Sequence, residues 1–105
     1  MIARIWRARA TPQGATVYLT HITGGVLPKL AAIAGYRGAS VLRRTDGASV
    51  ELLVVTYWES MVAVQAFAGA TPDVAVVEPA ARAVLSDFDD FVHHFEVAHT
   101  ARSLG

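Results

Sequence analysis

Residues 36–58 have the sequence YRGASVLRRTDGASVELLVVTYW, and this stretch decides the fold. Its second half, 49–58, is nearly continuously apolar and rich in the β-branched and aromatic residues that strands favour. Asp46-Gly47 comes just before it, and this pair tolerates the positive φ angles of a tight turn. The stretch therefore predicts a β-hairpin of strands 36–44 and 49–58. Strand 49–58 is expected to be buried on both faces, because polar residues do not alternate along it.

The segment before the hairpin predicts one strand and then helices. Residues 2–9 (IARIWRAR) alternate as a half-buried strand does. Thr11-Pro12 is typical of a helix start, with Thr11 as the N-cap. We expect a helix over 12–23 that ends at Gly24-Gly25, followed by a short helical turn from Leu27 to Ile33.

The segment after the hairpin repeats the order of helix and strand. Ser60 is the expected N-cap of the next helix. Residues 73–78 and 79–86 predict one kinked helix or two short helices that meet at Pro79. Residues 88–98 (FDDFVHHFEVA) predict the last strand.

The predicted order is strand, helix, strand, strand, helix, strand. Right-handed crossovers then give a four-stranded antiparallel sheet with helices on one face, which is the α+β ferredoxin-like β-α-β-β-α-β arrangement. We assign residues 1–98 to this domain and residues 99–105 to a C-terminal tail. One face of the sheet is left without helices, and two such faces would form a barrel between subunits.

The composition excludes several classes of protein. The chain has 105 residues, enough for one domain, and 9 Lys and Arg balance 9 Asp and Glu. Nucleic-acid binders need a basic surplus, so no nucleic acid is expected as a partner. The absence of cysteine excludes disulfide, thiol and iron–sulfur chemistry. With no secretory signal or membrane-length apolar run in the sequence, we expect a cytoplasmic protein without a membrane partner.

The apolar content of 53% is high for a small monomer. A chain of this size leaves much of its surface exposed, so this content predicts a second apolar surface that an identical subunit covers. The charges are also segregated, since seven basic residues and no acid precede Asp46, whereas the chain from Asp46 onward has nine acids and two arginines. Two interpretations remain open: charge-complementary strands within the sheet or across a dimer, or a basic pocket mouth that attracts an anion.

Several stretches resemble the antibiotic biosynthesis monooxygenase family of dimeric α/β barrels. They are IARIWRAR, LPKLAAIAGYRGASVLRR, VELLVVTYWES, MVAVQAFAG, DVAVVEPAARAVL and FVHHFEVAH. The resemblance implies a homodimer packed sheet against sheet, with a pocket between the sheet and the helices of each subunit. Some members oxidise polyketide phenols with O₂ and without metal or flavin, and others degrade haem. The haem-degrading members use an Asn, a Trp and a His where this chain has Trp6, Phe67 and Pro79, so the resemblance does not imply haem degradation.

Two side chains are the candidate catalytic groups. His93 and His94 are adjacent in a strand and point to opposite faces, and the resemblance favours His94 as the pocket histidine. His94 either accepts a proton or orients a ligand, or it is a structural histidine bonded to Glu96 or to backbone. Arg4 either holds an enolate, phenolate or carboxylate oxygen, or extends its charge to the sheet edge over Trp6.

Aromatic side chains and a further histidine are the candidate substrate-binding groups. Tyr18 and His21 are three residues apart and share a helix face. Together with Trp6, Tyr57 and Phe67 they line a flat pocket or simply form core. No metal site is expected, because the histidine spacings HxH and HxxxH are missing from the helices. Phosphate-binding glycine loops and the GxSxG nucleophile motif are also missing from the sequence.

The first hypothesis is a cofactor-independent monooxygenase that acts on a small electron-rich aromatic or enolisable substrate. His94 would be the base or orienting group and Arg4 would stabilise the anion. The second is a non-catalytic, stress-related dimer that binds a small ligand in the same pocket. The third is a structural dimer with a fully packed interior.

Overall fold

The predicted hairpin is present in the computed structural model, which describes residues 1–101. Strand β2 (Tyr36–Asp46) pairs antiparallel with β3 (Ser49–Trp58) along its whole length. Gly47 in the connecting turn has φ of +62°, a conformation in which a side chain would be strained. The turn residue that the sequence indicated therefore sets the register of the hairpin.

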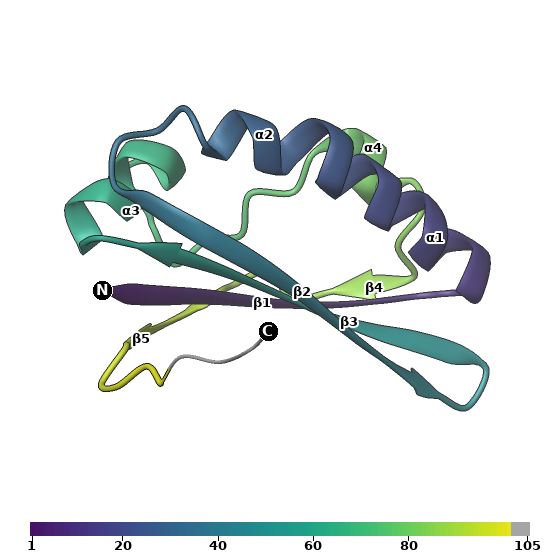
Figure 1. The fold of residues 1–105 in the computed structure, drawn as a ribbon. Helices are drawn as coiled ribbons and strands as arrows, with labels where there is room; N and C mark the ends of the chain where they lie inside the picture. The colour runs from purple at the N-terminus through teal and green to yellow at the C-terminus, as the bar shows by residue number, and fades with distance from the viewer. Residues whose placement is uncertain (102–105) are drawn as a thin grey trace.

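The sheet is antiparallel, in the order β2-β3-β1-β4, and β1 (Ile2–Ala10) lies at its centre. The short strands β4 (Asp87–Phe88) and β5 (His93–Glu96) both pair with β1, at different points along it. Figure 1 shows the helices stacked over one face of this sheet. The predicted α+β ferredoxin-like arrangement is confirmed, with the place of the fourth strand shared by two short strands.

The prediction of one continuous strand over 88–98 is wrong. The Asp89 amide still donates to the Arg7 carbonyl of β1 (3.0 Å), but beyond it the chain leaves β1 and bonds to the loop before α4. The Ala75 amide donates to the Asp90 carbonyl (2.9 Å), and the Val92 amide donates to the Asp73 carbonyl (2.8 Å). These contacts also explain why residues 73–78 are not helical: Val74 forms a β-bridge with Phe91. The helix after them, α4, covers only Pro79–Arg82.

The helices before the hairpin run on without the predicted break. Helix α1 (Pro12–His21) begins at Thr11, whose hydroxyl accepts from the Gly14 amide as predicted. A π-helical turn, η1 (Ile22–Val26), then leads into α2 (Leu27–Leu30). The prediction that Gly24-Gly25 ends the helix is wrong, because both glycines lie within the wider π-helical turn.

Helix α3 (Met61–Ala68) follows the hairpin and begins as predicted, with the Ser60 hydroxyl accepting from the Ala63 amide. Before it, Gly35 adopts φ of +90° and lies against α3. A Cβ at Gly35 would be 2.5 Å from the Cβ of Ala63. Only glycine allows this close approach between the loop and the helix.

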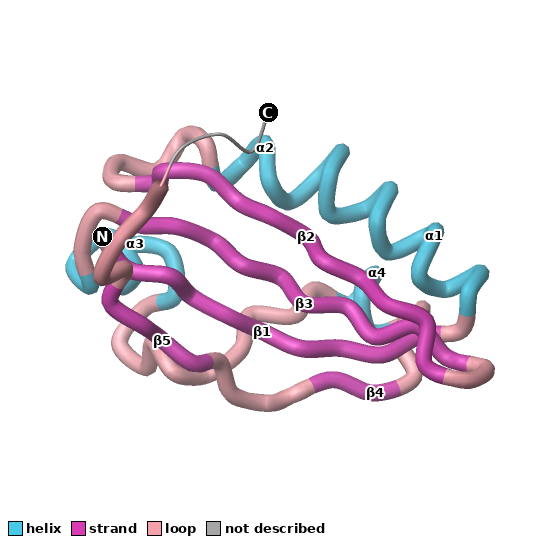
Figure 2. Tube along the Cα trace, turned by 60° about the horizontal axis from the view of Figure 1, so that its bottom comes forward, coloured by secondary structure: helices cyan, strands magenta, loops and turns pink. Residues whose placement is uncertain are grey.

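Strand register assigns each side chain to one of two faces of the sheet, since paired residues point the same way. Arg4 shares a face with Thr56 and His94, and Ala3 shares the opposite face with Tyr57. We call the first the helix-covered face and the second the open face. Figure 2 shows the strands side by side, with the helices gathered behind them.

The core lies between the helix-covered face and the helices. Trp58 and Leu52 of β3 and Val64 of α3 are its largest fully buried side chains. The Trp58 ring stacks on Phe67 with centroids 5.4 Å apart and meets Tyr36 edge-on at 5.5 Å. These contacts hold α3 against the end of the sheet at which β1 begins.

No described helix is both long and apolar enough to cross a membrane. The predicted tail, 99–105, lies partly outside the described residues.

Candidate functional site

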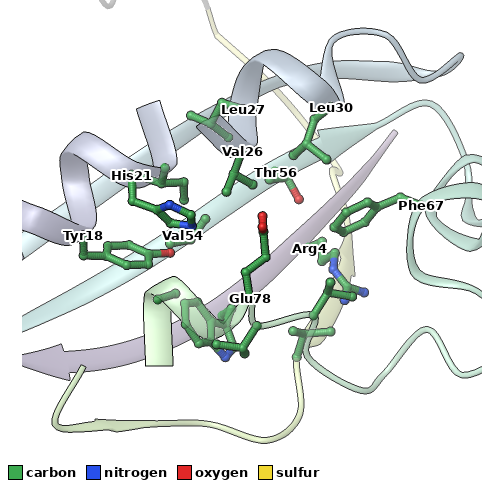
Figure 3. Close-up of a pocket in the computed structure, with 16 residues that line it drawn as sticks. Arg4, Tyr18, His21, Val26, Leu27, Leu30, Val54, Thr56, Phe67 and Glu78 are labelled. Carbon is green, nitrogen blue, oxygen red and sulfur yellow. The ribbon is translucent and has the colours of Figure 1, made fainter. Parts of the chain in front are cut away.

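A pocket lies between the helix-covered face and the helices, where the family resemblance places one. Its volume is about 100 Å³. Figure 3 shows its lining, which comes from β1, α1, η1, α2, β3, α3, the segment between α3 and the end of α4, and the segment between β4 and β5. The residues that line it are Arg4, Trp6, Tyr18, His21, Ile22, Val26, Leu27, Leu30, Val54, Thr56, Phe67, Val76, Val77, Glu78, Ala81 and Val92.

Most of the predicted site residues meet in this pocket. Five of them line it: Arg4, Trp6, Tyr18, His21 and Phe67. Two others do not. Tyr57 pairs with Ala3 and lies on the open face, so the prediction of Tyr57 as a pocket wall is corrected. His94 lies on the helix-covered face but is separated from the cavity by Arg4.

Arg4 is buried, with 4% of its surface exposed, and its guanidinium is held by several acceptors. Nη1 donates to the Pro72 carbonyl and to His94 Nε2 (3.0 Å), and Nη2 donates to the Val74 carbonyl (3.2 Å). The guanidinium carbon also lies 5.5 Å from the centre of the Phe67 ring. Arg4 therefore fastens the loop before α4 to the sheet.

Burial lowers the pKa of Arg4 below its ordinary value, and nearby Asp73 partly offsets this. Arginine stays charged even so, because its pKa starts so high. A guanidinium has five N–H donors, and three are used here. The other two donate to no group within residues 1–101, and Arg4 lines the pocket. Neither of the two sequence-based interpretations of Arg4 anticipated that backbone carbonyls would hold it, since these carbonyls come from a loop distant in the sequence.

His94 has both ring nitrogens engaged. Nδ1 lies 3.2 Å from Asp73 Oδ1, and Nε2 lies 3.0 Å from Arg4 Nη1. A guanidinium can only donate, so His94 Nε2 accepts the hydrogen bond from Arg4. The ring proton is then on Nδ1, which donates a hydrogen bond to Asp73. Burial, followed by the charge of Arg4, lowers the pKa of His94 below its ordinary 6.5. His94 is therefore a neutral histidine that orients Arg4, and its acidic partner is Asp73 rather than Glu96.

Glu78 is a pocket residue that the sequence interpretation missed. Figure 3 shows its carboxylate reaching into the cavity, between Tyr18 and His21 on one side and Arg4 and Phe67 on the other. The signal was ambiguous, because a glutamate before Pro79 is equally typical of an exposed helix start.

His21 and Tyr18 share one wall of the pocket, as their spacing predicts. Their ring centroids are 6.5 Å apart. His21 Nε2 is buried and has no hydrogen-bond partner among the described residues. Burial also raises the pKa of the Tyr18 hydroxyl far above its ordinary 10.0, so this group stays neutral.

The charged and imidazole groups do not assemble a metal site. Within residues 1–101 no three His, Asp or Glu side chains come together as a metal ion requires. His93 pairs with Ile5 on the open face and so lies on the opposite side of the sheet from His94.

Comparison with known proteins supports the fold but stops short of an activity. No family model matches the chain, and no curated protein matches it. Among solved structures, the haem degrader MhuD from Mycobacterium tuberculosis, which holds two haems in its active site, is 25% identical. Its TM-score is 0.62, and the match covers 97% of this chain and all of that one.

Two further structures share the fold at lower identity. The monooxygenase ActVA-Orf6 of Streptomyces coelicolor, in complex with nanaomycin D, is 20% identical with a TM-score of 0.64 over 99% of this chain and 91% of that one. A Bacillus cereus protein named as an antibiotic biosynthesis monooxygenase is 16% identical with a TM-score of 0.66 over 99% and 97%. The resemblance predicted from the sequence is thereby confirmed in the fold.

Proposed function

This chain has the fold of the antibiotic biosynthesis monooxygenase family, and from that premise we propose that it is a cofactor-independent monooxygenase. Its substrate is a small electron-rich aromatic or enolisable compound that binds in the pocket. The observation that carries the proposal is Arg4: a buried guanidinium in the wall of a largely apolar cavity, with two donors that no group within residues 1–101 uses. Such a group stabilises an oxyanion far better than an exposed one, because water does not compete.

The reaction needs no outside reductant. A substrate methylene that is acidified by a neighbouring ring or carbonyl loses a proton, and the resulting anion supplies the electrons that reduce O₂. Overall, R₂CH₂ and O₂ give R₂C=O and H₂O, so atoms and electrons balance. The chain's part is to accept the proton, hold the anion and exclude water. In this scheme Arg4 holds the anion, and His94 is a positioning residue that orients Arg4.

Oxygen uptake by the purified protein with anthrone tests the proposal. We expect uptake that depends on the protein, and a fall in kcat of about 100-fold in Arg4→Lys, which keeps the charge but loses the planar fork. Arg37→Lys is the matched control, since Arg37 is exposed and pairs with Glu59 away from the pocket. Circular dichroism below each variant's melting temperature establishes that both are folded.

The alternative, a non-catalytic ligand-binding module, predicts a different result. Phenols and anthrone would then raise the melting temperature without any consumption of O₂. A structural dimer predicts neither effect, and the pocket beside Arg4 argues against it.

Haem as the substrate is not part of the proposal. Haem-degrading members act with an Asn, a Trp and a His at positions where this chain has Trp6, Phe67 and Pro79. The chain therefore lacks the side chains on which that reaction depends. Titration with haemin should leave the haemin spectrum without the shift that axial ligation produces, and a saturable shift would contradict this.

The proposed active form is a homodimer joined through the open face. Leu42 and Phe95 on this face are 52% and 57% exposed, and Leu53 and Tyr57 between them are half-buried. Such apolar groups on a sheet without helices favour a second sheet as cover. Sedimentation should give a dimer mass, and Phe95→Lys should shift it to the monomer.

A further inference from the structure

Glu78 brings a carboxylate into a mostly apolar pocket without using it for structure. It is the N-cap residue of α4, yet its side chain makes no hydrogen bond to the amides of that helix. Instead it reaches into the cavity (Figure 3). None of the salt bridges within residues 1–101 includes it. Glu78 is half-buried, and a ligand that fills the cavity would displace water from its carboxylate and would therefore have to donate to it.

His21 supplies a second polar atom without a partner. Its Nε2 is buried and unbonded in the part of the chain that the structure describes, although the ring lines the cavity. The chain widens into the π-helical turn Ile22–Val26 directly after His21, and such turns are frequent at functional sites. Buried polar atoms in proteins nearly always have a hydrogen bond. A ligand in the cavity would supply the missing one.

We propose that Glu78 is the proton acceptor of this pocket and that His21 binds a second polar atom of the same ligand. The ligand is then a small, neutral hydroxyaromatic or enol compound that carries a second hydrogen-bonding group, such as a carbonyl. This inference rests on the proposed function, for which it names the base and the substrate class.

Glu78 takes this role because His94 is not free to do so. Both nitrogens of His94 are engaged with Arg4 and Asp73, and it does not line the cavity. In the proposed step, the O–H bond of the ligand breaks and the proton passes to a carboxylate oxygen of Glu78. The electron pair stays on the ligand oxygen, and the free donors of Arg4 stabilise the oxyanion. No electron leaves the ligand until O₂ reacts.

The same geometry makes the pocket selective for uncharged ligands. An anionic ligand would bring a second negative charge beside Glu78, and a like charge without a partner opposes binding. The neutral phenol, in contrast, donates to Glu78. The pocket should therefore bind the protonated form of a phenol in preference to its phenolate.

Binding of 4-nitrophenol tests this directly, because only its phenolate absorbs visible light. Near neutral pH both forms are present in solution. With the wild-type protein we expect the phenolate absorbance to fall, because the bound phenol donates to Glu78 but keeps its proton at equilibrium and releases it only in the reacting complex. With Glu78→Gln the negative charge is gone and Arg4 remains, so the phenolate should be bound and its absorbance should rise.

Two further variants complete the design. Glu96→Gln removes an exposed carboxylate outside the pocket and should behave as the wild type. His21→Phe keeps an aromatic ring beside Tyr18 but lacks Nε2, and it should weaken 4-nitrophenol binding about tenfold without reversing the absorbance change. Each variant's melting temperature is measured first. If Glu78→Gln does not fold, Glu78→Ala is used and should give the same rise.

The outcomes separate this inference from the proposed oxygenase. If the wild type binds neutral 4-nitrophenol but consumes no O₂ with anthrone, the oxygenase is wrong and the binding role of Glu78 stands. If Glu78→Gln binds the same form as the wild type, the role of Glu78 is wrong whatever the activity. If the wild type does not bind 4-nitrophenol at all, the proposed ligand class is wrong.

Discussion

Two regions of the molecule, the open face of the sheet and the pocket between the sheet and the helices, each hold a carboxylate, but the two carboxylates have different surroundings. On the open face, Glu51 is surrounded by arginines from both neighbouring strands. Its carboxylate lies 2.6 Å from Arg44 Nε, 3.4 Å from Arg9 Nη2 and 3.5 Å from Arg7 Nε. In the pocket, Glu78 from the segment before α4 forms no salt bridge within residues 1–101. The first arrangement is complete within the chain, whereas the second leaves hydrogen bonds for a ligand.

This difference also decides between the two interpretations of the charge segregation along the chain. The arginines around Glu51 all come from the basic first part of the sequence, and Glu51 comes from the acidic part. The interpretation as charge-complementary strands within one sheet is therefore confirmed. The structure does not have a basic pocket mouth. The lining contains one guanidinium, Arg4, and one carboxylate, Glu78, so it has no surplus of positive charge.

The largest expected effect is from the loss of Arg4. Arg4→Met should lower the free energy of unfolding by about 3 kcal/mol, since it leaves buried carbonyls of the loop at Pro72 and Val74 without donors. Urea denaturation measures the change. The matched control, Arg37→Met, removes an exposed ion pair with Glu59 and should cost at most about 0.5 kcal/mol. Equal losses in both variants would mean that Arg4 does not hold the loop.

A smaller loss is expected on the open face from Glu51→Gln. The hydrogen bond from Arg44 is the main cause that lowers the pKa of Glu51 from its ordinary 4.5. The folded protein therefore holds this group ionised more firmly than the unfolded chain, and stability is lost as the pH falls below 4.5 and through the folded value. Melting temperatures measured across this acid range should fall less steeply in Glu51→Gln. A slope unchanged from the wild type would show that the arginines do not stabilise the carboxylate.

Local signals in the sequence predicted the elements that local interactions decide. Thr11 and Ser60 cap helices, and Gly47 forms the hairpin turn, because each acts on backbone within a few residues. Alternation along residues 2–9 likewise placed Arg4 and Trp6 on one face, which proved to be the face with the pocket. The hairpin, the first strand, the starts of two helices and five of the pocket-lining residues could be anticipated in this way.

Long-range contacts decided the rest. Residues 73–78 resemble a helix in isolation, but their amides and carbonyls pair with the chain between β4 and β5. That pairing directs Glu78 into the cavity and brings Pro72 and Val74 close to Arg4. No short sequence pattern indicates either of these two placements. Tyr57 was misplaced for a related reason, because a buried strand without polar alternation does not reveal which of its faces the helices cover.

His94 provides a subtler test of the same network. Its neutral form accepts from Arg4, and its pKa is below 6.5 because of burial, with further lowering by Arg4 and His93 and an opposing effect of Asp73. Protons then bind the unfolded chain more readily, so the wild type should lose stability as the pH falls below 6.5. His94→Gln keeps an acceptor and a donor but cannot titrate, and its stability should change less over this range. Thermal unfolding at a series of pH values checks this, with His99→Gln, an exposed site, as the control.

The smallest expected effect concerns Tyr18, and it is spectroscopic. Burial raises the pKa of Tyr18 far above 10.0, so its phenol should ionise only when the protein unfolds in alkali. The absorbance of phenolate in the native protein should therefore follow the same curve in the wild type and in Tyr18→Phe up to the pH of unfolding. In denaturant, Tyr18→Phe should lose the contribution of one of the three tyrosines. If Tyr18→Phe instead shows less phenolate absorbance than the wild type while still folded, the Tyr18 hydroxyl is exposed to water. The pocket wall beside His21 and Glu78 would then not exclude water.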